Sequence, residues 1–180
     1  MCTHKYAFLF LLLLLPPVTR AELGLDLKPM LGTPAPANFE SVVMPDGRGL
    51  PAGSGTVTEG KQLYMMQCAA CHGIDGTQKG NVIAGGQGTL ATARPIKTVG
   101  SYWPYATTLY DYVNRAMPYG NEKSLTANEV YAVSAYVLHL NGIVGENVRL
   151  DQDSLPKVEM PNRDGFWTSA DFGGNAVRPD

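Results

Sequence analysis

Cysteine and histidine are scarce in this chain, and their scarcity excludes several common structural sites. The 180 residues contain three cysteines (Cys2, Cys68 and Cys71) and three histidines. Cys68 and Cys71 have no second Cys or His pair at a matching spacing, so the four ligands of a structural zinc site are missing. Cys2 lies in a leader-like N-terminal segment, and without it two cysteines remain. A disulfide framework is therefore not expected.

Long apolar runs and a surplus of positive charge are also lacking. The longest apolar run, residues 7–15, is well short of the roughly 20 residues that cross a bilayer. The formal net charge is −2, and it becomes −4 if a leader containing Lys5 and Arg20 is removed. This balance gives no reason to expect nucleic acid or an anionic membrane surface as a partner.

The N-terminus has the pattern of a secretory signal. Lys5 precedes the apolar run of residues 7–15, two prolines interrupt it, and Ala21 provides a small residue for cleavage. We expect residues 1–21 to be a signal peptide, and the rest to be a soluble protein exported to the periplasm. An uncleaved membrane anchor is the alternative.

The most informative motif is Cys68-Ala69-Ala70-Cys71-His72. Two thiols three positions apart on a helical turn can form thioethers with the two vinyl groups of one haem, and the next residue can place an imidazole on its iron. A thioredoxin-type redox pair would require a βαβ pattern, whereas the surrounding sequence is typical of helix. The motif therefore predicts one covalently bound haem c.

The rest of the chain divides into a central domain and two flanks. Residues 22–55 are rich in Pro and Gly and are expected to form an extended N-terminal arm. Residues 56–144 form the expected mono-haem domain, and residues 145–180 an irregular acidic tail. Within the domain we expect helices from Thr56 or Thr58 to about Ala70, over residues 105–116, and from Thr126 to Gly142, with a glycine-rich loop over residues 73–100.

The sixth ligand of the iron has several candidates. Met117 lies between two expected helices, and Pro118 restrains its backbone, so the sequence favours this thioether. The other candidates are Met44, Met65, Met66, Met160 and His139. Ligation by Met117 would leave no open position on the iron and would favour electron transfer over oxygen or peroxide chemistry.

The arrangement over roughly residues 56–142 resembles a class I cytochrome c, an all-α fold. Residues 45–56, 97–108 and 160–166 are further similar to the cytochrome subunits of sulfite- and sulfane-dehydrogenase-type molybdenum enzymes. The resemblance implies that Cys68 and Cys71 anchor the haem and that His72 and Met117 are its axial ligands. It also implies a molybdenum subunit that oxidises a sulfur compound and passes electrons singly to this haem.

Lys97, Tyr102 and Trp103 bring three donor groups to one short segment. They are candidates for contact with the haem propionates, where they would tune the reduction potential. The alternative is that the two aromatic rings only pack and that Lys97 is a solvated charge. Arg94 and Arg115 are weaker candidates for the same role or for docking a partner. We expect Tyr64 and Tyr136 to pack between the first and last helices.

The sequence thus predicts a periplasmic electron-transfer protein that receives electrons from a molybdenum sulfur-compound dehydrogenase and passes them to a downstream cytochrome or oxidase. It indicates no independent catalytic site. A general carrier to a terminal oxidase is one alternative, and a ligand-binding or catalytic haem protein with an open iron position is another. The acidic flanks are either a docking surface or solvated extensions.

Overall fold

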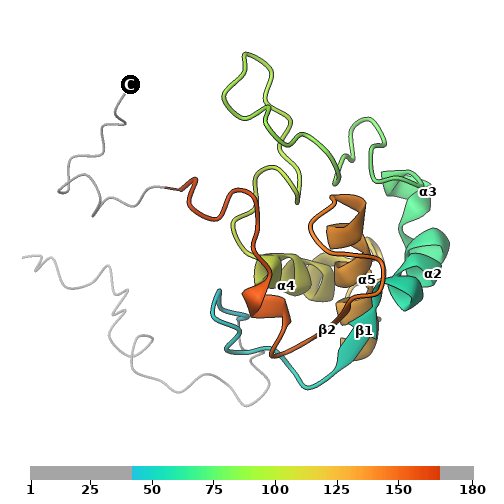
Figure 1. Cartoon of the computed structure of the whole chain (residues 1–180). Helices are drawn as coiled ribbons and strands as arrows, with labels where there is room; N and C mark the ends of the chain where they lie inside the picture. The colour runs from blue at the N-terminus through green and yellow to red at the C-terminus, as the bar shows by residue number, and fades with distance from the viewer. Residues whose placement is uncertain (1–41, 167–180) are drawn as a thin grey trace, which may run out of the picture. The chain divides into compact units, whose positions relative to one another are not determined.

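The computed structural model describes residues 42–166. The elements follow the order β1 (Ser54–Thr56), α2 (Val57–Gln67), α3 (Ala69–His72), α4 (Ala106–Ala116), α5 (Ala127–Leu140), β2 (Arg149–Asp151) and the 3₁₀ turn η1 (Leu155–Lys157) (Figure 1). Helices therefore dominate, with little strand, as the sequence predicts. The expected signal segment and the outer parts of both flanks lie outside the described residues. In residues 42–166 no helix is long and apolar enough to cross a membrane.

Capping boxes begin helices α2 and α5. At the start of α2 the Thr56 hydroxyl accepts a hydrogen bond from the backbone N–H of Glu59, whose carboxylate accepts one from the backbone of Thr56. Thr126 and Glu129 repeat this arrangement at the start of α5. Each box satisfies two backbone donors that a helix leaves unpaired at its N-terminus. Both capping predictions are confirmed, and Thr56, not Thr58, caps the first helix.

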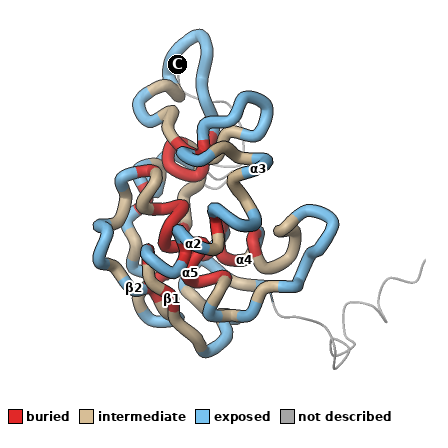
Figure 2. Tube along the Cα trace, turned by 90° about the vertical axis from the view of Figure 1, so that its right-hand side faces the viewer, coloured by how far each residue is buried: buried red, intermediate tan, exposed pale blue. Residues whose placement is uncertain are grey.

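Helices α2 and α5 cross in close contact. Gly60 of α2 faces the backbone of Ala132 so closely that a β-carbon there would collide with its carbonyl. One turn further along α2, the Tyr64 ring packs against Tyr136 with centroids 5.1 Å apart, which confirms their predicted role. Buried residues of α2, α4 and α5 pack together in one hydrophobic core (Figure 2).

The chain after α5 contributes to the core more than its composition suggests. β2 pairs antiparallel with β1, with Gly55 opposite Leu150. Leu150, Leu155 and Met160 are each at most 3% exposed. The expectation of an irregular tail thus differs from the structure up to residue 160, because isolated apolar residues with no helical or strand period carry little local signal. The first expected helix also differs, since Cys68 separates α2 from α3.

The long connection between α3 and α4 is tied to the end of α5 (Figure 1). The Asn141 side chain donates to the carbonyl of Ile83 (3.2 Å) and accepts from the N–H of Gly85 (3.0 Å). The Gln87 amide donates to the Asn141 carbonyl (2.8 Å). Gly100 leaves room for the Asn141 side chain, which a β-carbon there would strike. One buried amide therefore fixes a loop that contains no regular element.

Candidate haem-binding site

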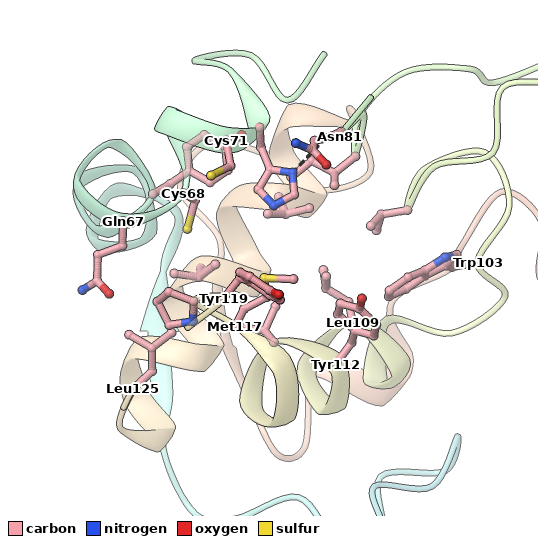
Figure 3. Close-up of a pocket in the computed structure, with 18 residues that line it drawn as sticks. Gln67, Cys68, Cys71, Asn81, Trp103, Leu109, Tyr112, Met117, Tyr119 and Leu125 are labelled. Atoms are coloured by element: carbon pink, nitrogen blue, oxygen red, sulfur yellow. Dashed lines mark hydrogen bonds between the residues drawn. The ribbon is translucent and has the colours of Figure 1, made fainter. Parts of the chain in front are cut away.

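A cavity of about 560 Å³ lies between α3, the loop after it, and the inner faces of α4 and α5. Its walls are mainly apolar and include Ile83, Val99, Leu109, Val113, Val133 and Val137. Cys68, Cys71 and His72 line one part of it, and Met117 lines another. Figure 3 shows Cys68 and Cys71 on one side and Met117 across from them, with its sulfur directed inward. The volume is in the range of small-molecule and cofactor sites.

The two thiols lie on one turn at the junction of α2 and α3. The backbone N–H groups of Cys71 and His72 both donate to the Cys68 carbonyl, at 3.1 and 3.0 Å, and so hold the three functional residues together. Burial, with a smaller contribution from Cys71, raises the pKa of the Cys68 thiol to about 11. The apolar wall therefore disfavours the charged thiolate at this position.

The imidazole of His72 is oriented by a backbone group. Its Nδ1 lies 2.8 Å from the carbonyl oxygen of Asn81, and because a carbonyl only accepts, Nδ1 carries the proton. Nε2 is then the free ligand atom, as in the usual pairing of a metal-binding histidine with a second-layer acceptor. Sequence reasoning did not find Asn81, since any residue type supplies a backbone carbonyl.

Tyr64 stabilises the turn that follows the motif. Its hydroxyl donates to the carbonyl of Gly73 (2.8 Å), directly after His72, and its ring lines the cavity. Burial, with smaller contributions from Cys68, Tyr136 and Asp75, raises the pKa of Tyr64 to about 12. The phenol is therefore a neutral donor at physiological pH, a role that goes beyond the packing expected of it.

Met117 is the one methionine of residues 42–166 that lines the cavity. It follows α4, and its N–H donates to the Val113 carbonyl (3.1 Å), which places it at a helix end. Among the other candidates, Met160 is buried in the core, Met44 and Met65 are 39% and 40% exposed, and Met66 is 71% exposed. His139 lines a separate, smaller cavity and donates through Nδ1 to the Val144 carbonyl (3.1 Å).

Of the three candidate donors Lys97, Tyr102 and Trp103, only Trp103 lines the cavity. Trp103 lines the cavity and packs edge-on against Tyr112, with ring centroids 5.6 Å apart. Lys97 and Tyr102 are not among the lining residues; the Lys97 ammonium lies 4.9 Å from the centroid of the Tyr102 ring. Tyr102 ends a turn over residues 99–102, and its ring packs edge-on against Phe166 (centroids 5.1 Å apart), so it lies outside the cavity wall that Trp103 lines.

The two arginines singled out from the sequence lie outside the cavity wall. Arg94 is exposed in the loop after α3. Arg115 pairs with Asp111 one turn earlier on α4, with its Nε 2.8 Å from the carboxylate.

The donor set fits a c-type haem. Two thiols at the required spacing, an imidazole with a free Nε2 and a thioether directed inward surround an apolar space large enough for a flat macrocycle. The apolar walls would exclude water from the ring, and the exposed face at Cys71 and Tyr119 would leave an edge accessible to a partner. Such a site suits the exchange of single electrons.

The sequence model of the cytochrome c family matches residues 57–141. The chain belongs to this family, as the two relatives below also show. It is thus an electron-carrying haem protein, since members of the family bind haem c covalently. The chain is 37% identical to a chain of the sulfane dehydrogenase SoxCD from Paracoccus pantotrophus, with a TM-score of 0.71 over 83% of this chain and 80% of that one. It is also 30% identical to the photosystem II extrinsic protein V of Microcystis aeruginosa over 105 residues, which is 51% of this chain and 78% of that protein.

Proposed function

We propose that this chain binds one haem through thioethers at Cys68 and Cys71, with His72 and Met117 as the axial ligands. The proposal is supported by the position of all four side chains on the wall of one cavity. When bound, such a haem supplies a one-electron change at its iron. A thioether from Met117 is a soft, neutral ligand that favours the ferrous state, and the Asn81 carbonyl holds the His72 imidazole in the ligating tautomer.

We further propose that the electrons come singly from a molybdenum dehydrogenase that oxidises sulfite or a related sulfur compound. They pass on to a downstream cytochrome or oxidase. The observation that carries this proposal is the similarity to the sulfane dehydrogenase chain, which covers 83% of this chain, whereas the family model covers residues 57–141. The likeness therefore includes flanking segments that an ordinary cytochrome domain does not require.

The sequence supports the proposed location in the periplasm. The leader pattern of residues 1–21, together with a haem attachment motif, supports export to the periplasm, where c-type haem is attached. Export can be tested by N-terminal sequencing of the periplasmic protein. A chain that begins at Glu22 is expected, and a chain that retains the apolar run would contradict the proposed cleavage.

The partner is tested by rapid mixing of the purified holoprotein with the candidate molybdenum dehydrogenase. Addition of sulfite should reduce the haem within the turnover time of the dehydrogenase, as measured by haem absorbance. A chemical reductant provides the control, because it shows that the haem is reducible without the enzyme. Slow reduction by enzyme and sulfite, with normal chemical reduction, would reject this donor and favour a general carrier.

A further inference from the structure

The segment after the core residue Met160 packs against residues 102–105, which include one residue of the cavity wall, Trp103. We call residues 160–166 the C-terminal clip. Met160 is 3% exposed and anchors the clip in the core. Two turns follow, with the N–H of Arg163 donating to the Met160 carbonyl (3.0 Å) and that of Gly165 to the Asn162 carbonyl (3.1 Å). These bonds give the clip a defined shape in place of a loose end.

The clip makes three contacts with residues 102–105. The Asn162 side-chain amide donates to the Tyr102 carbonyl at 2.7 Å. The Arg163 guanidinium lies over the Tyr105 ring, 4.6 Å from its centroid. The Phe166 ring meets the Tyr102 ring edge-on at 5.1 Å. Hydrogen bonding, cation–π attraction and aromatic packing therefore all act on one short segment.

That short segment contributes one residue to the cavity wall and leads into α4. It contains Trp103, which lines the cavity, and it ends at Tyr105, the residue that precedes α4 and provides no side-chain cap for it. Helix α4 in turn provides Leu109 and Val113 to the cavity and ends at Ala116, directly before Met117. A contact that fixes residues 102–105 thus fixes both the indole and the start of the helix that leads to the proposed sulfur ligand.

We infer that Asn162 is a positioning residue: through the Tyr102 carbonyl, it holds Trp103 and the start of α4 against the haem cavity. If the bond is lost, the wall loosens and water reaches the site more easily. Water stabilises the more highly charged oxidised state, so the reduction potential falls. The inference rests on the proposed haem in this cavity but not on any particular electron donor.

Two substitutions disturb the clip in different ways. Asn162→Ala removes the donor. Gly165→Ala keeps Asn162, but a methyl group there would collide with its side-chain amide and displace it from Tyr102. Matched controls make the same chemical changes elsewhere on the tail: Asn147→Ala at an exposed residue, and Gly145→Ala, where a β-carbon meets nothing within 4 Å.

The test is a spectroelectrochemical titration of the purified holoproteins, with no partner enzyme present. Both clip variants should have a lower midpoint potential than the wild type, and both controls should match the wild type. The N–H of Tyr102, which donates to the Thr98 carbonyl, should exchange with solvent up to about tenfold faster in the clip variants.

If the clip only stabilises the fold and does not position the cavity wall, the titration gives a different result. The clip variants would then unfold at lower temperature, yet keep the potential of the wild type, and this outcome overturns the inference. Failure of the proposed function is separate, because it would appear as a wild-type protein without covalent haem, or as one that the dehydrogenase cannot reduce.

Discussion

Met117 and Met66 are chemically identical side chains with opposite surroundings. Met117 lines the cavity, whereas Met66 is 71% exposed on α2. The motif predicted the haem, but the choice among methionines depended on which one folds back to the cavity. At the scale of single residues, covalent attachment of a haem could thus be predicted from the sequence. For the sixth ligand of the iron, the sequence could only favour Met117 over the other methionines.

The ligand proposal makes a direct prediction for Met117→Leu. Leucine conserves the volume but cannot coordinate iron, so the potential should fall and the ferrous protein should bind carbon monoxide nearly completely. Difference spectra and a potential titration measure both effects, with Met66→Leu as the control that should resemble the wild type. A variant with wild-type potential and no gain in carbon monoxide binding would exclude Met117 as the ligand.

Tyr110 provides a second prediction at this scale. Its side chain is fully buried, its ring centroid is 4.5 Å from that of Tyr131, and its hydroxyl has no hydrogen-bond partner within residues 42–166. A buried hydroxyl without a partner costs stability, so Tyr110→Phe should raise the free energy of unfolding at neutral pH by about 1 kcal/mol.

The same variant should change the response to alkali. Burial raises the pKa of Tyr110 from 10.0 to about 12. Between these values the unfolded chain loses the phenol proton and the folded chain keeps it, so the wild type loses stability as pH rises. The Phe variant lacks this loss, and its advantage should grow by at most about 1.4 kcal/mol per pH unit. Denaturant titrations from pH 7 to 11 measure the difference. A Tyr119→Phe control, at a side chain 89% exposed, should show neither effect.

At the scale of elements, the capped starts of α2 and α5 were predictable and the crossing of these helices was not. The Thr56–Glu59 and Thr126–Glu129 capping boxes are local patterns, so they identify the starts of α2 and α5 from sequence. The close approach of α2 to α5 requires Gly60 and Ala132 to meet, and these residues are far apart in the chain. The role of Gly60 could therefore not be predicted from the sequence, and it became clear only from the position of Ala132 in the structure.

Gly60→Ala is expected to reverse the usual effect of this substitution. In an open helix, alanine would stabilise by about 1 kcal/mol. Here its methyl group would collide with the Ala132 carbonyl, and overpacking of this kind costs about 1–3 kcal/mol. Chemical denaturation of the holoprotein should therefore show a net loss of stability. Gln62→Ala, at an exposed position of the same helix, should be near neutral. A stabilised Gly60→Ala protein would contradict the close crossing.

At the scale of the whole molecule, the chain after α5 belongs partly to the core. Leu150, Leu155 and Met160 are buried, so a chain that ends at residue 144 should lose about 1.5–3 kcal/mol for each of them. We expect this truncation to yield little stable holoprotein, as measured by denaturation and by haem content. A chain that ends at Phe166 keeps all three residues and should remain folded. Equal stability of the two truncated chains would contradict the burial of Leu150, Leu155 and Met160 in the core. The affinity of the longer variant for a partner tests whether residues 167–180 take part in docking, because this variant keeps the core.

The sequence by itself determined the haem motif, the two capping boxes and the resemblance to the cytochrome c class, because covalent spacing and capping depend on residues within a few positions of each other. Only the tertiary structure decided which methionine reaches the cavity, that Trp103 lines it while Lys97 and Tyr102 do not, and that residues 160–166 pack against residues 102–105. These features depend on contacts between residues far apart in the chain, and apolar packing leaves no period in sequence when the segments involved have no regular structure.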